Sequence, residues 1–246
     1  MNNFRVKSLK ILNSKIFQYI LYSPMLDFHQ WKLLRFVKRC SSGINSHESI
    51  LDMGAGELRY KKYFDHCNYR SQDLCVGDNV WYFESIDIKS SIYNVPVEPN
   101  SFEYVLCTQV LEHLEYPEKA FIEFNRVLKY GGKVFLSAPL GQGEHQVPYD
   151  FFRYTKFGLK SLGERYGFRM IYIEPHGGIF INLEYMLWQA IGKLIPFGKS
   201  IPVRYFLFFL LLPIKFISGT IFIILDVFDR DKGYTNNYNC IYEKVS

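Results

Sequence analysis

The chain has 246 residues, of which 48% are hydrophobic and 22% charged, so it can bury one sizeable core and is not a disordered protein. Its net charge of +5 comes from residues 1–45, where Asp27 is the only acidic side chain among many lysines and arginines. The five cysteines form no Cys-x-x-Cys pair, which argues against a disulfide framework or a zinc site. The protein is therefore expected in a reducing compartment, the cytosol. Lys10 and Lys15 interrupt the N-terminal apolar residues, so no signal peptide is expected.

The basic region 1–45 is expected to form two amphipathic helices. Apolar residues recur at helical spacing among lysines over residues 4–21, and the segment "DFHQWKLLRFVKR" at 27–39 shows the same pattern. These helices can pack against the rest of the protein with a solvated basic face, or they can lie on an acidic membrane surface. The sequence leaves both interpretations open.

Strand and helix patterns alternate over residues 49–174, which predicts an α/β fold with a mostly parallel sheet and helices on both faces. The "YGG" at 130–132 is expected to end a helix that begins near Pro117, and the "YGF" at 166–168 is expected to end the next helix. Strands are expected near residues 49–53, 69–73, 82–86, 103–108, 132–138, 168–174 and 239–245.

Residues 205–225 are apolar apart from Lys215 and are long enough to span a membrane. A single crossing would separate the final strand from its sheet, so we expect two half-length segments, broken near Pro213 to Lys215, that enter one leaflet and return. The alternative is an apolar helical pair buried against the domain or a dimer partner. Aromatic and basic residues beside the segment favour the membrane; they are Tyr185, Trp188, Lys193, Lys199, Arg204 and Tyr205.

A glycine turn follows the first expected strand in "SILDMGAGELRY", Ser49 to Tyr60. Gly54 and Gly56 let the backbone pass close to a nucleotide-like ligand. The dinucleotide-binding pattern has a third glycine where this chain has Arg59, which disfavours NAD. Asp73, at the end of the next strand, can accept hydrogen bonds from both ribose hydroxyls, so an adenosine-containing ligand is expected.

The succession "ILDMGAG", "QDL", "NVPVEPNSFEYVLCTQVLEHL" and "EFNRVLKYGGKVFLSAPL" resembles the class I S-adenosylmethionine-dependent methyltransferases, and within them the type 11-like group. The resemblance covers about residues 48–175. It implies a Rossmann-like sheet of seven strands, six parallel and one antiparallel, with S-adenosylmethionine as cofactor. Ser91 stands where the family often has an acidic residue near the adenine. The implied cofactor-binding residues are Asp52, Gly54, Ala55, Gly56, Asp73, Ser91, Thr108 and Gln109.

Two histidines are candidate bases for methylation of an oxygen acceptor. His113 follows the fourth strand and His145 follows the fifth, so both lie in loops at the carboxyl edge of the sheet. Local bonding at the start of a helix is the alternative role of His113. Glu112-His113 also resembles part of a Glu-x-x-Glu-His element with which some methyltransferases hold a divalent metal. Gln109 replaces its first glutamate, which leaves Glu112, His113 and His145 as a thin ligand set, and no metal is expected.

The segment "HQVPYDFFRYT", residues 145–155, resembles a signature of bacterial methyltransferases from surface-glycan gene neighbourhoods. The resemblance implies acceptor recognition by His145 and Tyr149, and Tyr149 is the third expected catalytic residue. Asp150 and Arg153 can instead pair with each other, and Thr155, within the same segment, can cap the following helix.

The expected function is O-methylation of a membrane-presented acceptor such as a lipid-linked saccharide or another small amphipathic molecule. A catalytically silent, membrane-tethered scaffold with the same fold is the alternative, and an RNA methyltransferase ranks last, because the basic arm lacks a dense basic stripe. No nucleic-acid partner is therefore favoured, and the oligomeric state stays open.

The expected organisation has three parts. Residues 1–45 form the basic amphipathic helices, residues 46–178 with 236–246 form the methyltransferase domain, and residues 179–235 form an apolar helical insertion before the last strand. The expected location is the cytoplasm, on the inner face of the membrane.

Overall fold

The computed structural model describes residues 23–76, 83–194 and 201–246, and for residues 201–208 it describes the backbone alone. The helix expected at 4–21 lies outside the described residues. The chain divides into two units, which are described separately: residues 1–34 with 176–236, and residues 35–175 with 237–246. Helix α3 (Phe28–Ser42) contributes residues to both units, and its first turn is capped by Asp27, whose Oδ1 accepts the backbone N–H of Gln30 at 2.9 Å.

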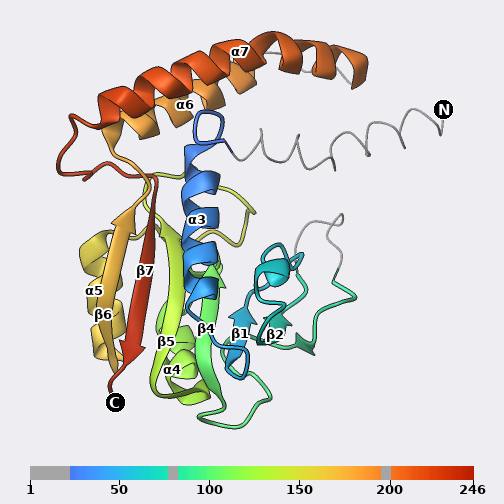
Figure 1. The fold of residues 1–246 in the computed structure, drawn as a ribbon, viewed down its shortest axis with the longest axis vertical. Coiled ribbons are helices and arrows are strands. Elements are labelled where there is room, and N and C mark those ends of the chain that lie inside the picture. Colours follow the sequence, from blue (N-terminus) through green and yellow to red (C-terminus); the bar gives the residue numbers. More distant parts are fainter. Residues whose placement is uncertain (1–22, 77–82, 195–200) are drawn as a thin grey trace. The chain divides into compact units, whose positions relative to one another are not determined.

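The second unit contains one seven-stranded sheet (Figure 1). Its strand order is β3-β2-β1-β4-β5-β7-β6, and β7 is antiparallel to both of its neighbours while the other pairs are parallel. This arrangement confirms the Rossmann-like, mostly parallel sheet. The strands are β1 (Ser49–Met53), β2 (Asn68–Asp73), β3 (Ile88–Lys89), β4 (Phe102–Thr108), β5 (Leu128–Pro139), β6 (Phe168–Pro175) and β7 (Asn237–Lys244).

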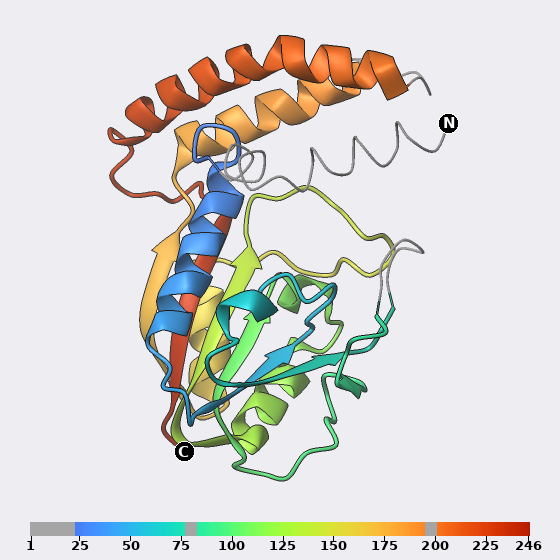
Figure 2. The ribbon, with the colours of Figure 1, turned by 45° about the vertical axis from the view of Figure 1, so that its right-hand side comes forward.

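Helices cover both faces of this sheet. The carboxyl-terminal half of α3 lies on one face, while α4 (Pro117–Val127) and α5 (Lys156–Arg165) lie on the other (Figures 1 and 2). The core under α4 and α5 is aromatic: the ring of Phe121 lies 5.9 Å from that of Phe168 and 5.5 Å from that of Tyr242, centroid to centroid. Gly163 of α5 makes room for this packing, because a Cβ there would lie 2.5 Å from the Tyr242 ring.

Two expected boundaries are wrong. The described part of the strand expected at 82–86 is a turn, and β3 begins only at Ile88, because the carboxylate of Asp87 accepts the backbone N–H and hydroxyl of Ser71 just before the ladder with β2 starts. The helix that begins at Pro117 ends at Val127 and not at "YGG". Leu128 already pairs with Phe102 of β4, and the next pair is Lys133 with Tyr104. Residues 129–132 therefore form an irregularity in the register of β5. The "YGF" stop is confirmed.

The first unit contains α6 (Ile179–Leu194) and α7 (Ile201–Asp226), which run side by side (Figure 2). Helix α7 continues through Pro213, so the expectation of two half-length segments is wrong. A proline removes one backbone hydrogen bond from a helix, and α7 nevertheless continues while packed along α6. Gly219 lets the carbonyl of Met25 approach α7, because a Cβ there would collide with it. Within α7, Phe209–Asp226 is long and apolar enough to cross a membrane by length and composition.

Candidate active site

The glycine turn after β1 has the conformation that its sequence predicts. Gly54 and Ala55 donate their backbone N–H groups to the carbonyl of Gln72 in the neighbouring strand, at 2.9 and 3.0 Å. Gly54 has φ +81° and Gly56 has φ +50°, a region that side chains with a Cβ resist. A Cβ at Gly54 would also collide with the side chain of Val110. The turn therefore needs glycine for its backbone and for its packing.

Asp73 ends β2 beside this turn, where the expected cofactor needs an acceptor. Its Oδ2 accepts the backbone N–H of Gly56 at 2.8 Å, and its Oδ1 accepts that of Cys75 at 2.7 Å. Each carboxylate oxygen keeps a lone pair for a second donor, so the group can still accept both hydroxyls of a ribose. These residues fit S-adenosylmethionine. The next residue, Leu74, is 61% exposed and adds an apolar surface that the sequence motifs did not single out.

The other expected cofactor residues lie along the same edge. Asp52 is buried in β1 and accepts the hydroxyl of Tyr69 at 2.6 Å, and burial raises its pKa to about 7. The hydroxyl of Ser91 accepts a backbone N–H at 3.2 Å, and Thr108 ends β4. Their contacts with a cofactor stay a prediction.

Gln109 follows β4 with φ +56° and turns toward β5. Its backbone N–H donates to the carbonyl of Ser137 at 3.0 Å, and its side-chain amide donates to the hydroxyl of the same residue at 3.0 Å. The side chain is therefore held against the strand.

Three ligand-type side chains meet at the carboxyl ends of β4 and β5. Glu112 and His113 belong to a short 3-10 helix, η2 (Leu111–His113), and His145 belongs to the loop after β5. Nε2 of His113 lies 3.9 Å from Oε1 of Glu112, and Nε2 of His145 lies 4.0 Å from the same oxygen. The two imidazole rings are 4.8 Å apart and nearly perpendicular. We call Glu112, His113 and His145 the Glu-His-His cluster.

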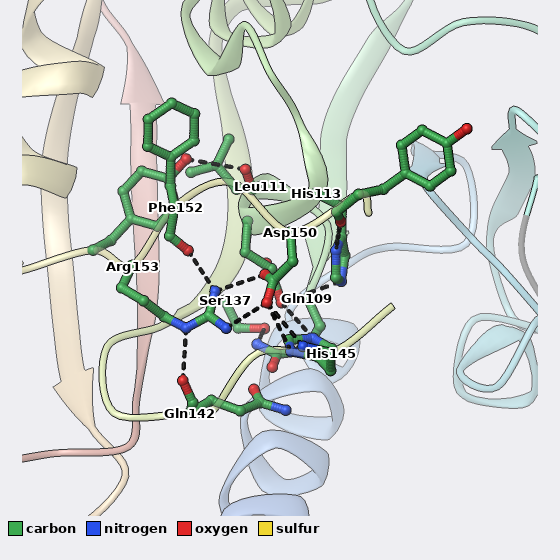
Figure 3. A network of polar contacts seen from close by, with 12 residues as sticks. Gln109, Leu111, His113, Ser137, Gln142, His145, Asp150, Phe152 and Arg153 are labelled. Carbon is green, nitrogen blue, oxygen red and sulfur yellow. Dashed lines mark hydrogen bonds and ion pairs between the residues drawn. The ribbon is translucent and has the colours of Figure 1, made fainter. Parts of the chain in front are cut away.

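Backbone hydrogen bonds fasten the His145 loop to η2 (Figure 3). The carbonyl of Glu112 accepts the N–H groups of Phe151 and Phe152 at 2.8 and 3.3 Å. The hydroxyl of Tyr154 donates to the carbonyl of Leu111 at 3.0 Å. These bonds hold two segments that are distant in the sequence next to each other, which explains how His145 reaches the other two members of the cluster.

An ion pair within the loop supports His145. The Arg153 guanidinium donates to both oxygens of Asp150 at 2.7 Å and holds the pKa of that carboxyl at about 2. Oδ2 of Asp150 in turn accepts the backbone N–H of His145 at 2.9 Å. The expected Asp150–Arg153 pair is present, and Thr155 caps α5, accepting the N–H of Gly158 at 3.0 Å.

The environment of the cluster disfavours charge on its members when nothing is bound. Burial raises the pKa of Glu112 to about 8 and lowers the pKa of His113, which keeps the carboxyl protonated and the imidazole neutral near pH 7. Nδ1 of His113 lies 2.5 Å from the carbonyl of Tyr149. Tyr149 therefore contacts the cluster through its backbone, while its side chain is 56% exposed.

Exposed apolar side chains surround the loop beside the cluster. The side chains of Val147, Tyr149, Phe151 and Phe152 are all 40% exposed or more. The aromatic rings among them face outward, which the sequence does not show. The site thus combines a polar cluster with an apolar rim.

Residues 51–136 match the methyltransferase domain family. No curated protein shows significant sequence similarity to the chain.

Solved structures share the fold at low sequence identity. An S-adenosylmethionine-dependent methyltransferase from Archaeoglobus fulgidus is 14% identical, with a TM-score of 0.55 over 92% of this chain and 99% of that one. The phosphoethanolamine N-methyltransferase 2 of Haemonchus contortus, solved with S-adenosyl-L-methionine, is 15% identical with a TM-score of 0.52, over 96% of this chain and 60% of that one. The [4+2]-cyclase SpnF is 14% identical with a TM-score of 0.55, over 88% and 82%.

At these identities the structures establish the fold, and the family match establishes the domain. The glycine turn and Asp73 lie together at the edge of the sheet, and their contacts with the cofactor stay a prediction. The chain thus carries a methyltransferase domain, in a fold that it shares with S-adenosylmethionine-dependent methyltransferases.

Proposed function

We propose that the chain methylates an oxygen atom of an amphipathic acceptor that is presented at a membrane surface. The observation that carries this proposal is the Glu-His-His cluster, which collects basic lone pairs at the carboxyl edge of the sheet. An alcohol must lose its proton as it is methylated, whereas a neutral amine attacks with a lone pair that is already free. A cluster of this kind therefore favours a hydroxyl acceptor.

The chain's residues divide the work of the reaction. When bound, S-adenosylmethionine supplies a methyl group on a positively charged sulfur, which leaves as a neutral thioether while the acceptor oxygen takes the methyl group. Asp73 and the turn at Gly54–Gly56 hold the cofactor. The cluster takes up the hydroxyl proton, and the loop 145–155 orients the acceptor so that its oxygen lies in line with the methyl group. The exposed rings of this loop suit an acceptor with an apolar part.

The membrane part of the proposal is supported by α7. Leu210, Ile214, Ile217, Ile221 and Ile224 are each at least 50% exposed and follow one another at intervals of three and four residues, which forms a continuous apolar stripe. Phe209 and Phe216, at other positions around the helix, are also exposed. An apolar surface that extends around a helix suits lipid better than a partner that covers a single face.

Lys215 is the one charged residue within the apolar sequence 205–225, and it is neutralised within the unit. Nζ of Lys215 lies 2.7 Å from Oε1 of Glu184 in α6, and it also lies 5.2 Å above the ring of Trp188. The indole N–H donates to Ser218 at 2.9 Å. Paired in this way, the lysine opposes insertion less than an isolated charge would.

Transfer of labelled methyl groups tests the acceptor class. The purified chain is incubated with methyl-labelled S-adenosylmethionine and either bacterial lipid extract or the matching water-soluble extract, and the product is analysed by mass spectrometry. We expect label in an ether-linked methyl group of a lipid-phase product. Label confined to water-soluble products or to nitrogen atoms would contradict the proposal.

Vesicle flotation tests the membrane part separately. The wild type is expected to float with anionic phospholipid vesicles. The double variant Ile217→Ser/Ile221→Ser is expected to float at least about tenfold less, because two apolar side chains are lost from the face that enters the lipid. Ile122→Ser, at a 53% exposed position on α4, serves as the matched control and should float like the wild type. Equal flotation of all three proteins, or concentration-dependent dimerisation through the stripe without lipid binding, would overturn this part.

A further inference from the structure

Hydrogen bonds among the described residues leave the Glu-His-His cluster unsatisfied. Both carboxylate oxygens of Glu112 and Nε2 of His113 are buried and have no hydrogen-bond partner in the described part of the chain. Glu112 itself is fully buried. Because an unpaired buried polar group costs free energy, a folded protein rarely retains several at one point without a ligand.

The backbone fixes the tautomers of both histidines. Nδ1 of His113 faces the carbonyl of Tyr149 at 2.5 Å, and Nδ1 of His145 faces the carbonyl of Gly143 at 3.1 Å. A carbonyl oxygen can only accept, so Nδ1 of each ring carries the proton and Nε2 has a free lone pair. A carbonyl on the far nitrogen is the arrangement that orients metal-binding histidines in proteins.

The ligand atoms of the three groups lie nearly as close together as the ligands of a single ion. The separations of 3.9 and 4.0 Å between the imidazole Nε2 atoms and Oε1 of Glu112 are too long for direct hydrogen bonds, and all ligand atoms lie within 4.8 Å of one another. Ligands about 2.0–2.2 Å from a tetrahedral ion lie about 3.3 Å from each other. Small side-chain movements would therefore complete the set.

We propose that Glu112, His113 and His145 bind one divalent transition-metal ion of the Zn²⁺ or Mn²⁺ class. Two imidazoles and one carboxylate suit such an ion better than Mg²⁺ or Ca²⁺, which prefer oxygen ligands. The sequence predicts no metal because Gln109 replaces a glutamate ligand. In the structure Gln109 is bonded to Ser137, and His145 arrives from the following loop as the third ligand.

The ligand set also has a functional consequence, and only this step rests on the proposed function. Three protein ligands leave an open position on the ion, as in catalytic zinc sites. The acceptor hydroxyl fits that position, where the cation lowers its pKa. In the metal-loaded chain the imidazoles are ligands, so this step replaces proton uptake by the cluster, and the acidified hydroxyl releases its proton to solvent water. Asp150 lies outside the set because Arg153 holds both of its oxygens.

Isothermal titration of the chelator-treated full chain with Zn²⁺, Mn²⁺ and Mg²⁺ tests the site without any turnover. We expect one Zn²⁺ or Mn²⁺ per chain, with much weaker Mg²⁺ binding. Glu112→Gln and His145→Gln should each weaken Zn²⁺ binding about 100-fold or more, because each removes a direct ligand. His47→Gln, at an exposed histidine of the same unit, is the matched control and should bind like the wild type.

Titration of each variant with S-adenosylmethionine shows whether it is folded, and His145→Gln in the surface loop provides a second variant if Glu112→Gln does not fold. Absence of Zn²⁺ and Mn²⁺ binding by the wild type at submillimolar concentration would overturn the inference, and so would equal binding by all four proteins. Metal binding without an O-methylated product would leave the site in place and contradict the proposed function. Full methyl transfer in excess chelator would leave the proposed function in place and contradict the role of the metal in it.

Discussion

The imidazole rings of His113 and His145 lie 4.8 Å apart, centroid to centroid, with their planes at 81°. The first ring belongs to the turn after β4 and the second to the loop after β5, so their contact exists only because that loop is bonded to the carbonyl of Glu112. The chemistry of the site therefore depends on how firmly the loop is held.

Arg153→Lys should slow methyl transfer about tenfold or more without changing the affinity for S-adenosylmethionine. Arg153 bonds both oxygens of Asp150 and the carbonyls of Gln142 and Gly143, and a lysine ammonium cannot reproduce this planar set of donors. Steady-state kinetics and cofactor titration separate the two effects. Arg165→Lys, at an exposed position of α5, is the control; a similar loss in both variants would contradict the role of Arg153.

Asp52 should make the stability of the protein depend on pH. Burial raises its pKa to about 7 in the folded state, well above the usual value near 3.8, so between these values the folded chain keeps a proton that the unfolded chain has released. The free energy of unfolding must then fall as the pH rises from about 4 to about 7 and level off above that. Asp52→Asn removes this contribution.

The measurement is urea unfolding of the wild type and Asp52→Asn at several pH values. The wild type should lose stability relative to the variant as the pH rises through this window. A difference that stays constant from pH 4 to pH 8 would show that the carboxyl of Asp52 is not perturbed.

Two glycines of α5 should respond in opposite ways to alanine. Gly163→Ala should destabilise the protein by about 1–3 kcal/mol, because the new Cβ would press on the Tyr242 ring in a packed core. Gly158→Ala meets only the hydroxyl of Thr155 at 3.4 Å and should stabilise the helix by up to about 1 kcal/mol. Thermal unfolding of both variants tests this, and a stabilised Gly163→Ala would be inconsistent with the packing described.

Lys215 and Glu184 should show coupled energetics in the first unit. Lys215→Met leaves the carboxylate of Glu184 without its cation, and Glu184→Gln does the converse, so each should cost about 1–3 kcal/mol. The double variant should lose clearly less than the sum of the two single losses. Urea unfolding followed by tryptophan fluorescence measures the free energy of unfolding for this double-mutant cycle. Strictly additive losses would mean that the interaction between the two side chains contributes nothing to stability.

Much of the sheet follows from local sequence patterns. Six of the seven strands lie where apolar runs and glycine punctuation place them, and the turn at Gly54 with Asp73 follows from residue types at fixed spacing. The exception is β3, which consists only of Ile88–Lys89, whereas the pattern upstream predicts a strand at 82–86. Such a short strand is defined by its partner in β2, which a local pattern does not contain.

The sequence by itself determined the α/β class, the position of the cofactor turn and the candidate histidines, because hydrophobic period, glycine conformation and chain order are local properties. The tertiary structure decided that His145 joins Glu112 and His113 while Gln109 turns to Ser137, and that Pro213 lies inside a continuous α7. These outcomes depend on contacts between segments distant in the chain, whose energies outweigh the local preferences.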